Sequence, residues 1–175
     1  MESTRTNGAI SAQEEFFYPD MALAPLPAEL HLAMPRNGRP GVQLLVETDE
    51  PRLTPSLESA DFTPEFFCEL AVPVEYNTGD GVEQGGSMVL GSRPAQKPSY
   101  ATRLAPFAVY DCLKPAPGGH IEAENGRAAL YLCLCPRPDI RPGEHHALLR
   151  LGAYCCRLVI RVYGVEIPQD AFPVT

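Results

Sequence analysis

Hydrophobic and polar residues alternate along several short stretches of the chain, which is the pattern of strands that bury one face. Residues 30–34 carry large apolar side chains at every second position, and residues 42–47 repeat the pattern after an Asn37-Gly38 turn signal. The clearest alternation covers residues 68–76. Its buried face is expected to hold Cys68, Leu70, Val72, Val74 and Tyr76. The opposite face is expected to hold Glu69, Ala71, Pro73 and Glu75.

Proline and glycine divide the chain between these stretches. Pro73 lacks a backbone N–H, so it predicts a sheet edge or a bulge. Residues 77–99 are rich in Gly, Ser, Asn and Pro and predict a long loop. Strands are then expected over 101–109 and 119–124.

The last third of the chain is the most apolar. An Asn125-Gly126 turn leads into residues 128–135, which are apolar on both faces and predict a central strand. Residues 145–151 and 154–163 predict an antiparallel hairpin. Its inward side chains are expected to be Cys156, Leu158, Ile160 and Val162, and its outward ones Arg157 and Arg161.

About eight short strands with turn signals between them predict an all-β fold, an immunoglobulin-like antiparallel β-sandwich. The chain has 175 residues, enough for one ordinary domain with a core. We expect a flexible N-terminal lead over 1–13, the sandwich domain over 14–167, and an exit segment or linker over 168–175.

Charge and hydropathy exclude several classes of partner. The net charge is −8, so there is no uniform basic field to bind nucleic acid. No apolar stretch approaches the roughly 20 residues that span a bilayer, so no membrane partner is expected. Residues 1–13 lack the apolar segment of a secretory signal, which favours a cytoplasmic location.

The six cysteines lie in or beside apolar, strand-like runs, where a free Cys behaves as a small hydrophobe. Reduced core thiols are therefore expected. Cys133 and Cys135 form a Cys-x-Cys pair, but the second pair that makes zinc sites recognisable is missing. No metal site is predicted. His145-His146 at a strand start could bind a metal or a partner, although an exposed polar strand entry explains it more simply.

A search for catalytic residues predicts none. Glu122 and Glu124 share a strand face, but glycoside chemistry needs two carboxyls that converge across a cleft. Neither a phosphate-binding loop nor a Ser/His/Asp arrangement can be identified, so no cofactor is expected either. The chain contains no Trp. Sugar stacking would then fall on Tyr76, Tyr100, Tyr110 or Tyr131, for which core packing is the favoured interpretation.

The order of several short motifs resembles a known family. These are the apolar strand 30–34, the turn Arg36-Asn37-Gly38-Arg39 and the Gln-centred strand 42–46. Later come Tyr110-Asp111-Cys112-Leu113-Lys114-Pro115, an apolar strand ending in Pro136, and Arg141-Pro142-Gly143-Glu144. A strand over 159–162 and Val165-Glu166-Ile167-Pro168 close the series. Together they resemble the amino-terminal β-sandwich domain of bacterial glycoside hydrolases related to the family 123 β-N-acetylgalactosaminidases.

The resemblance implies a non-catalytic accessory domain. In that family the catalytic acidic pair belongs to a following barrel, so no catalytic residue can be assigned to this chain. The strand over 130–135 usually carries a Trp in the family, and Tyr131 or a neighbour stands there here. The implied partner is a glycosidase barrel; the alternative is a free-standing sandwich that binds a glycan or a protein.

The end of the chain provides the candidate docking residues. Ile167, Phe172 and Val174 lie between or beside Pro168 and Pro173, in an apolar tail that cannot continue as a central strand. A tail that ended a domain would more usually be polar. We therefore expect Phe172 to lie against a barrel or a second copy of the chain, and the isolated domain to self-associate weakly.

Overall fold

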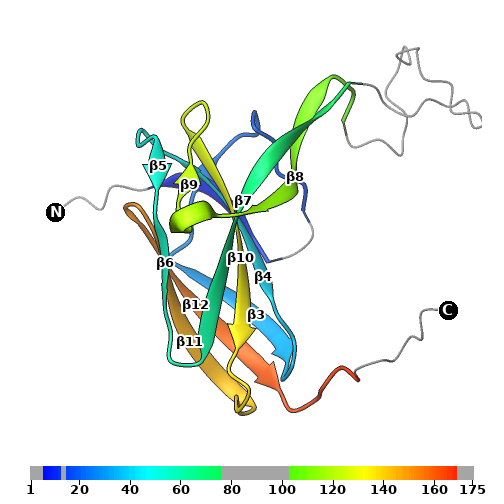
Figure 1. The fold of residues 1–175 in the computed structure, drawn as a ribbon, viewed down its shortest axis with the longest axis vertical. Coiled ribbons are helices and arrows are strands. Elements are labelled where there is room, and N and C mark those ends of the chain that lie inside the picture. The colour runs from blue at the N-terminus through cyan, green and yellow to red at the C-terminus, as the bar shows by residue number, and fades with distance from the viewer. Residues whose placement is uncertain (1–5, 13–14, 76–102, 169–175) are drawn as a thin grey trace, which may run out of the picture.

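Strands dominate the computed structural model, which describes residues 6–12, 15–75 and 103–168 (Figure 1). A six-stranded sheet has the order β2-β1-β4-β10-β7-β8. Its strands are β1 (Asn7–Ser11), β2 (Ala24–Pro25), β4 (Gly41–Glu47), β7 (Phe62–Val74), β8 (Phe107–Pro115) and β10 (Arg127–Pro136). A four-stranded sheet has the order β3-β12-β11-β6. Its strands are β3 (Glu29–Pro35), β6 (Pro55–Glu58), β11 (Gly143–Leu151) and β12 (Tyr154–Tyr163).

The inner faces of the two sheets form one core, because every second residue of the facing strands is apolar. Val42, Leu44 and Val46 on β4 alternate with outward-facing neighbours, and β10 contributes Ala128, Leu130, Leu132 and Leu134 in the same way. On β12 the core residues are Tyr154, Cys156, Leu158, Ile160 and Val162, and Val159 is buried as well. The predicted β-sandwich is confirmed, as are the central position of β10 and the β11–β12 hairpin.

The sheets differ in strand direction. All paired strands of the six-stranded sheet are antiparallel, whereas β3 runs parallel to β12. A small third sheet pairs β5 (Arg52–Leu53) with β9 (Ile121–Glu122), and a 3₁₀ turn over Pro117–Gly119 precedes β9. Leu53 and Ile121, which pair, both belong to the central core.

The turns follow the local sequence. Asn125 and Gly126 both have positive φ, 52° and 76°, and join the bridged residues Glu124 and Arg127 as predicted. The Asn37-Gly38 turn is also confirmed, with a hydrogen bond from the Gly38 N–H to the Pro35 carbonyl.

Several predictions are corrected by the pairing. The described residues contain twelve strands, not about eight, because short strands such as β5 and β9 carry too few residues to produce a pattern. The predicted lead over 1–13 is too long, since residues 7–11 form β1 beside β4. The strand expected over 101–109 begins at Phe107 and runs to Pro115.

The burial predicted from the alternation of residues 68–76 is confirmed at Cys68 and is wrong at the residues that follow it. Cys68 packs against the core, but Leu70 and Val72 are exposed, and Glu69 is buried. Beyond Cys68 the strand leaves β10 and continues with β8 alone as a two-stranded ribbon that projects from the sandwich (Figure 1). Pro73 lies in this ribbon, consistent with the expected edge, and a register shift follows Leu70. The predicted 77–99 loop lies outside the described residues.

No helix in the described residues is long and apolar enough to cross a membrane.

Candidate functional site

The outer face of the six-stranded sheet carries a second, smaller apolar cluster. Leu45 on β4, Ala129 on β10 and Tyr110 on β8 are buried there together with Phe17, whose side chain is 2% exposed. Phe17 forms a bridge with Tyr110, and the Tyr110 N–H donates to the Phe17 carbonyl at 2.9 Å. The chain between β1 and β2 therefore covers part of this face.

Charged side chains fasten that covering segment. The guanidinium of Arg127 donates to the carbonyl oxygens of Pro19 and Met21, at 2.6 and 2.9 Å. Arg103 pairs with Asp20 and lies over the ring of Tyr18. These contacts hold residues 17–21 against β10 and against Arg103, which precedes β8. The segment therefore forms a fixed wall on the outer face of the sheet.

Beside this wall lies a hollow of about 510 Å³, open to solvent. Its volume falls in the range of small-molecule sites. The residues that line it come from β1, β4, β7, β8, β10 and the covering segment, namely Ser11, Ala12, Glu15, Phe16, Gly41, Gln43, Glu69, Tyr110, Asp111, Leu113 and Tyr131. Three are acidic and, among these lining residues, none is basic. The hollow therefore suits a neutral polar ligand better than an anion.

Glu69 is the most perturbed ionisable group of this hollow. The residue is only 8% exposed, and its carboxylate accepts a hydrogen bond from the Gln43 amide at 3.0 Å. Burial raises the pKa of Glu69 to about 7, and the Gln43 hydrogen bond opposes this by stabilising the charged form. Near neutral pH the carboxyl group thus exists in both protonation states, so it can donate or accept a hydrogen bond.

Tyr131 reaches diagonally across the floor of the hollow toward β4. A Cβ atom placed on Gly41 would lie 1.9 Å from the Tyr131 hydroxyl oxygen, so the ring occupies the space that a side chain at 41 would need. Tyr110 is buried, which confirms core packing for that residue, whereas Tyr131 is only half-buried. Tyr76 and Tyr100, the other stacking candidates, lie outside the described residues.

A smaller hollow of about 190 Å³ shares Glu69 and Tyr110 with the first. Glu122 and Glu124, the carboxylate pair singled out in the sequence, both line it. Glu122 accepts a hydrogen bond from Arg52 at 2.8 Å, across the β5–β9 pair. Glu122 therefore forms a surface ion pair with Arg52. Glu122 and Glu124 do not line the larger hollow, so they do not face each other across it.

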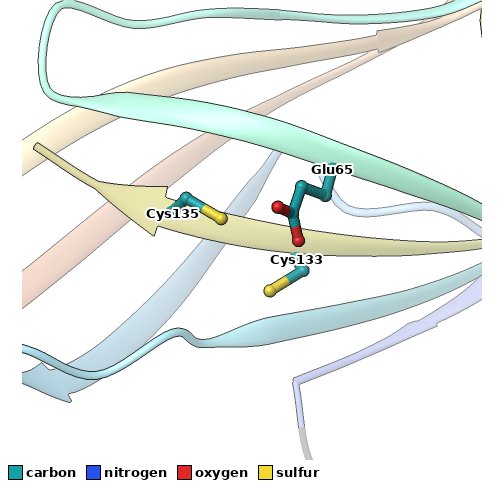
Figure 2. Close-up of side chains that lie close together, drawn as sticks. All are labelled: Glu65, Cys133 and Cys135. Atoms are coloured by element: carbon teal, nitrogen blue, oxygen red, sulfur yellow. The ribbon is translucent and has the colours of Figure 1, made fainter.

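A third group of side chains lies farther along the same outer face. Glu65 on β7 and Cys133 and Cys135 on β10 each place one donor atom within 4.8 Å of the others (Figure 2). The sequence showed only the Cys-x-Cys pair, because Glu65 is distant in the chain and is brought beside it by strand pairing.

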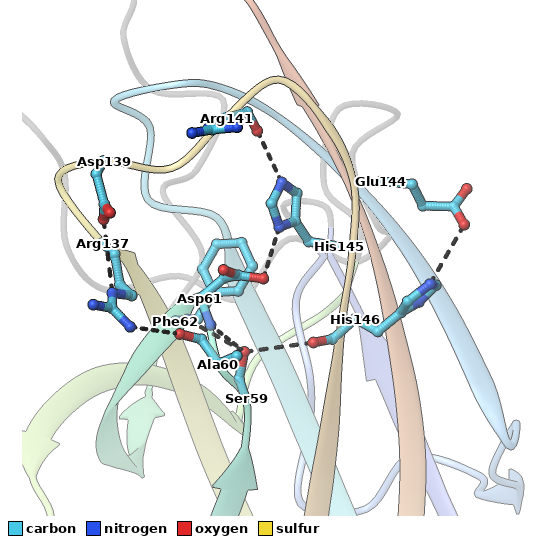
Figure 3. Close-up of polar contacts among 10 residues, drawn as sticks. All are labelled: Ser59, Ala60, Asp61, Phe62, Arg137, Asp139, Arg141, Glu144, His145 and His146. Atoms are coloured by element: carbon cyan, nitrogen blue, oxygen red, sulfur yellow. Dashed lines mark hydrogen bonds and ion pairs between the residues drawn. The ribbon is translucent and has the colours of Figure 1, made fainter.

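His145, near the start of β11, is held between two acceptors. Its Nδ1 lies 2.8 Å from an Asp61 carboxylate oxygen, and its Nε2 lies 2.8 Å from the Arg141 carbonyl (Figure 3). Its ring also meets the edge of Phe62. Its neighbour His146 contacts Glu144 at 3.5 Å. The His145-His146 pair, considered above for metal binding, therefore points to separate acidic partners.

The prediction that the thiols are buried in the core is fully confirmed only for Cys156. All six are free, but only Cys156 is completely buried, while Cys112 and Cys155 are exposed. Arg157 faces outward as predicted and contacts Glu29 at 3.6 Å on the adjacent strand β3.

Of the three docking candidates, only Ile167 is described. Its side chain is 58% exposed, although its backbone N–H and carbonyl both bond to the Asn37 side chain at 2.8 Å. Val165, 64% exposed, bonds through its carbonyl to the Arg36 N–H, and Glu166 pairs with the Arg36 side chain. Phe172 and Val174 lie outside the described residues.

Sequence reasoning missed Glu69 and Gln43 as site residues. Both occupy outward-facing positions of their strands, and the alternation places Glu69 on the face opposite to the predicted buried one. The only signal is that each is a polar residue between two apolar neighbours. Their burial depends on β8 and on the segment before β2, both remote in sequence.

The architecture has a counterpart among solved structures. One similar structure is that of a family 123 glycoside hydrolase from Clostridium perfringens, studied for glycolipid glycan hydrolysis, with a TM-score of 0.59 and 12% sequence identity. The likeness is one of fold. The match covers 94% of this chain and 28% of the hydrolase chain, so this chain spans little more than a quarter of that protein's length. No protein-family model and no curated protein sequence matches the chain.

Proposed function

We propose that this chain is a non-catalytic accessory β-sandwich domain that packs against and supports a glycosidase barrel. The observation that carries the proposal is the unequal coverage of the structural match: nearly all of this chain corresponds to a minor part of a glycoside hydrolase. A supporting domain needs a rigid fold and a surface that binds the partner domain. It needs no catalytic residues of its own.

The last described residues, 164–168, favour this role. Four backbone or side-chain contacts to Arg36 and Asn37 hold them along the β3–β4 turn. Val165 and Ile167 nevertheless direct most of their apolar surface to solvent. A segment that is fixed at its backbone and apolar at its side chains is suited to a partner surface. It leaves the sandwich at the end opposite to the β7–β8 ribbon (Figure 1).

The association of the purified chain tests the docking surface. We expect sedimentation velocity over a concentration series to show weak self-association that Ile167→Ser reduces. Leu70→Ser is the matched control, because Leu70 is also exposed but lies in the ribbon at the other end. The Phe172→Ser variant extends the test to the part of the tail outside the described residues. Strict monomer behaviour at high concentration, unchanged by Ile167→Ser and Phe172→Ser, would contradict the docking surface.

The absence of catalysis is tested separately. The purified chain should not hydrolyse aryl N-acetylhexosaminides above the buffer rate. Reproducible turnover that is lost in Glu122→Gln, Glu124→Gln or Glu69→Gln would show that the chain is itself an enzyme. The coding sequence on both sides of the 175 residues supplies a further check, because the proposal expects a glycosidase barrel encoded with it.

A second candidate function, glycan binding, is favoured by the 510 Å³ hollow. Sugar recognition combines a ring for stacking with paired polar groups, and here Phe16 and Tyr131 stand beside Glu69 and Gln43. Titration calorimetry with N-acetylhexosamines should then give binding that Gln43→Leu abolishes and Glu75→Gln leaves unchanged. If no binding is measured at millimolar sugar, the hollow is part of the scaffold only.

A further inference from the structure

We propose that Glu65, Cys133 and Cys135 form a binding site for a zinc-class divalent cation on the outer face of the six-stranded sheet. One donor atom from each of the three residues lies within 4.8 Å of the other two (Figure 2). The proposal is independent of the accessory-domain function, because it rests only on these side chains and their neighbours.

Strand geometry explains why the three donors converge. Cys133 and Cys135 are two residues apart on β10, so their side chains emerge on the same face. That face is the outer one, because Leu132 and Leu134 between and beside them are buried in the core. The β7–β10 register places Glu65 directly opposite Cys133. The ligand set therefore depends on one register, and a slip of one residue would remove Glu65 from it.

The spacing is close to what a zinc ion requires. Zinc–sulfur bonds of about 2.3 Å and zinc–oxygen bonds of about 2.0–2.2 Å place tetrahedral ligand atoms roughly 3.5–4 Å apart. The donors therefore need to approach by about 1 Å at most, which side-chain rotation supplies. Two sulfur donors select zinc and similar soft or borderline cations over Mg²⁺ and Ca²⁺, which prefer oxygen.

The surroundings allow an ion to enter and remain. Glu65 is about half exposed and both thiols are partly exposed, so solvent reaches the site. On the other neighbouring strand Gly41 lies opposite Cys133, and the Tyr131 ring fills the space that a side chain at position 41 would need. Two thiolates and one carboxylate leave a divalent site with one net negative charge. Arg39, 3.9 Å from Glu65, compensates it.

Binding must be coupled to proton release. The thiolate form of cysteine, not the thiol, is the metal ligand. When the cation binds, each S–H bond is exchanged for a sulfur–metal bond and two protons pass to the buffer. Because two protons are released, the apparent affinity should rise with pH by up to about a hundredfold per unit while the free thiols are protonated. With three protein ligands, a fourth position stays open to water or to a partner's side chain.

Cobalt(II) is the probe, because its thiolate charge-transfer and visible bands report sulfur ligands in a four-coordinate site. We expect the reduced 175-residue chain to bind one equivalent of Co²⁺, displaced by one equivalent of Zn²⁺. Cys133→Ser and Cys135→Ser should each weaken binding by at least about a hundredfold. Glu65→Gln should keep the charge-transfer band and weaken binding by about tenfold or more. The matched controls are Cys112→Ser and Cys155→Ser, which alter exposed thiols elsewhere.

Two further measurements make the outcomes decisive. Zinc should raise the thermal midpoint of the wild type and of Cys155→Ser by clearly more than that of Glu65→Gln, because only the complete site links β7 to β10. Far-ultraviolet circular dichroism verifies that each variant is folded. Binding that persists in the Cys133→Ser/Cys135→Ser double variant would overturn the proposal. So would loss of binding in the controls, or the absence of stoichiometric binding by the reduced wild type.

Discussion

At the scale of single residues, burial gives Glu69 a role that its polarity alone does not indicate. Its carboxyl group lies on an outward strand position, yet β8 and the segment before β2 exclude most of the solvent from it. Water would stabilise the charged form, so its exclusion raises the pKa of Glu69 to about 7. The residue is therefore a titrating group in the neutral range, in a hollow large enough for a ligand.

The pKa of Glu69 predicts a specific pH dependence of stability. Because the folded-state value lies above the unfolded one, the folded state is disfavoured as pH rises from about 4.5 to about 7, and the penalty is constant above that. Glu69→Gln should leave stability at pH 4 nearly unchanged and raise the free energy of unfolding at pH 8 by about 2 to 3 kcal/mol. Urea unfolding at both pH values measures the difference. Glu75→Gln, just after β7, is the control, and an equal response of both variants would contradict the prediction.

The pKa of His145 is raised as well, but here the fold stabilises the charged form of the group instead of disfavouring it. Both its contacts, the Asp61 carboxylate and the Arg141 carbonyl, are acceptors, so both ring nitrogens must carry protons. The hydrogen bond to Asp61 raises the pKa of His145, burial opposes the shift, and the Arg141 carbonyl adds to it. The imidazolium contribution is thus fully present below the unfolded value of about 6.5 and is lost as pH rises through the higher folded value.

His145→Asn should therefore destabilise the protein at pH 6 by about 1 kcal/mol, since partial exposure of Asp61 lets water screen the pair. The cost should shrink toward pH 9. Thermal unfolding across this range measures it. His146→Asn is the matched control, because its contact to Glu144 is longer and more exposed. A cost for His145→Asn that does not depend on pH would show that the imidazole acts through packing against Phe62 only.

At the scale of elements, the β4–β10 pair positions most of the outer face. Gly41 lies opposite Cys133, and the Tyr131 ring occupies the volume above Gly41. The pairing of β4 with β10 thus places the Tyr131 ring, which lines the hollow, over Gly41 beside the cysteine pair. The Cβ atom of an alanine at position 41 would need the space that the half-buried Tyr131 ring occupies.

Gly41→Ala should accordingly lower the free energy of unfolding by about 1 to 3 kcal/mol, through displacement of Tyr131. The same substitution in a Tyr131→Ala background should cost much less, because the space is then free. A double-mutant cycle measured by chemical denaturation gives the coupling. Independent, additive costs would show that the close approach is not what requires glycine at this position.

At the scale of the whole molecule, the six cysteines differ in how far the sandwich shields their thiols from solvent. Cys112 and Cys155 are exposed, three are partly exposed, and Cys156 is fully buried between the sheets. Reaction of Cys156 with a reagent requires opening of the sandwich, whereas the exposed thiols react in the native state.

Mass spectrometry after alkylation tests this order. In the native chain we expect rapid modification at Cys112 and Cys155, and modification of Cys156 last, at the rate of global unfolding. Under denaturing, non-reducing conditions all six sites should be modified. Two or more disulfides would contradict the expectation of reduced thiols and with it the cytoplasmic assignment, which stays a prediction.

What the sequence determined by itself was local. The two-residue period of β12 and the continuous apolar run of β10 predict strands, and the Asn125-Gly126 turn predicts a reversal. These signals act through side-chain direction and backbone φ, which depend on neighbouring residues only. The all-β sandwich followed from these, and the motif order pointed to the fold that the solved hydrolase structure shares.

What the tertiary structure decided was the environment of each face. The sequence assigned Leu70 to the core and Glu69 to the opposite, less buried face, and the exposures are reversed because β7 leaves the sandwich while remote segments cover its outer side. Glu65 joins the Cys133-Cys135 pair only through the β7–β10 register. Burial and ligand sets depend on contacts between segments far apart in the chain, and a local pattern carries no information about which segments will meet.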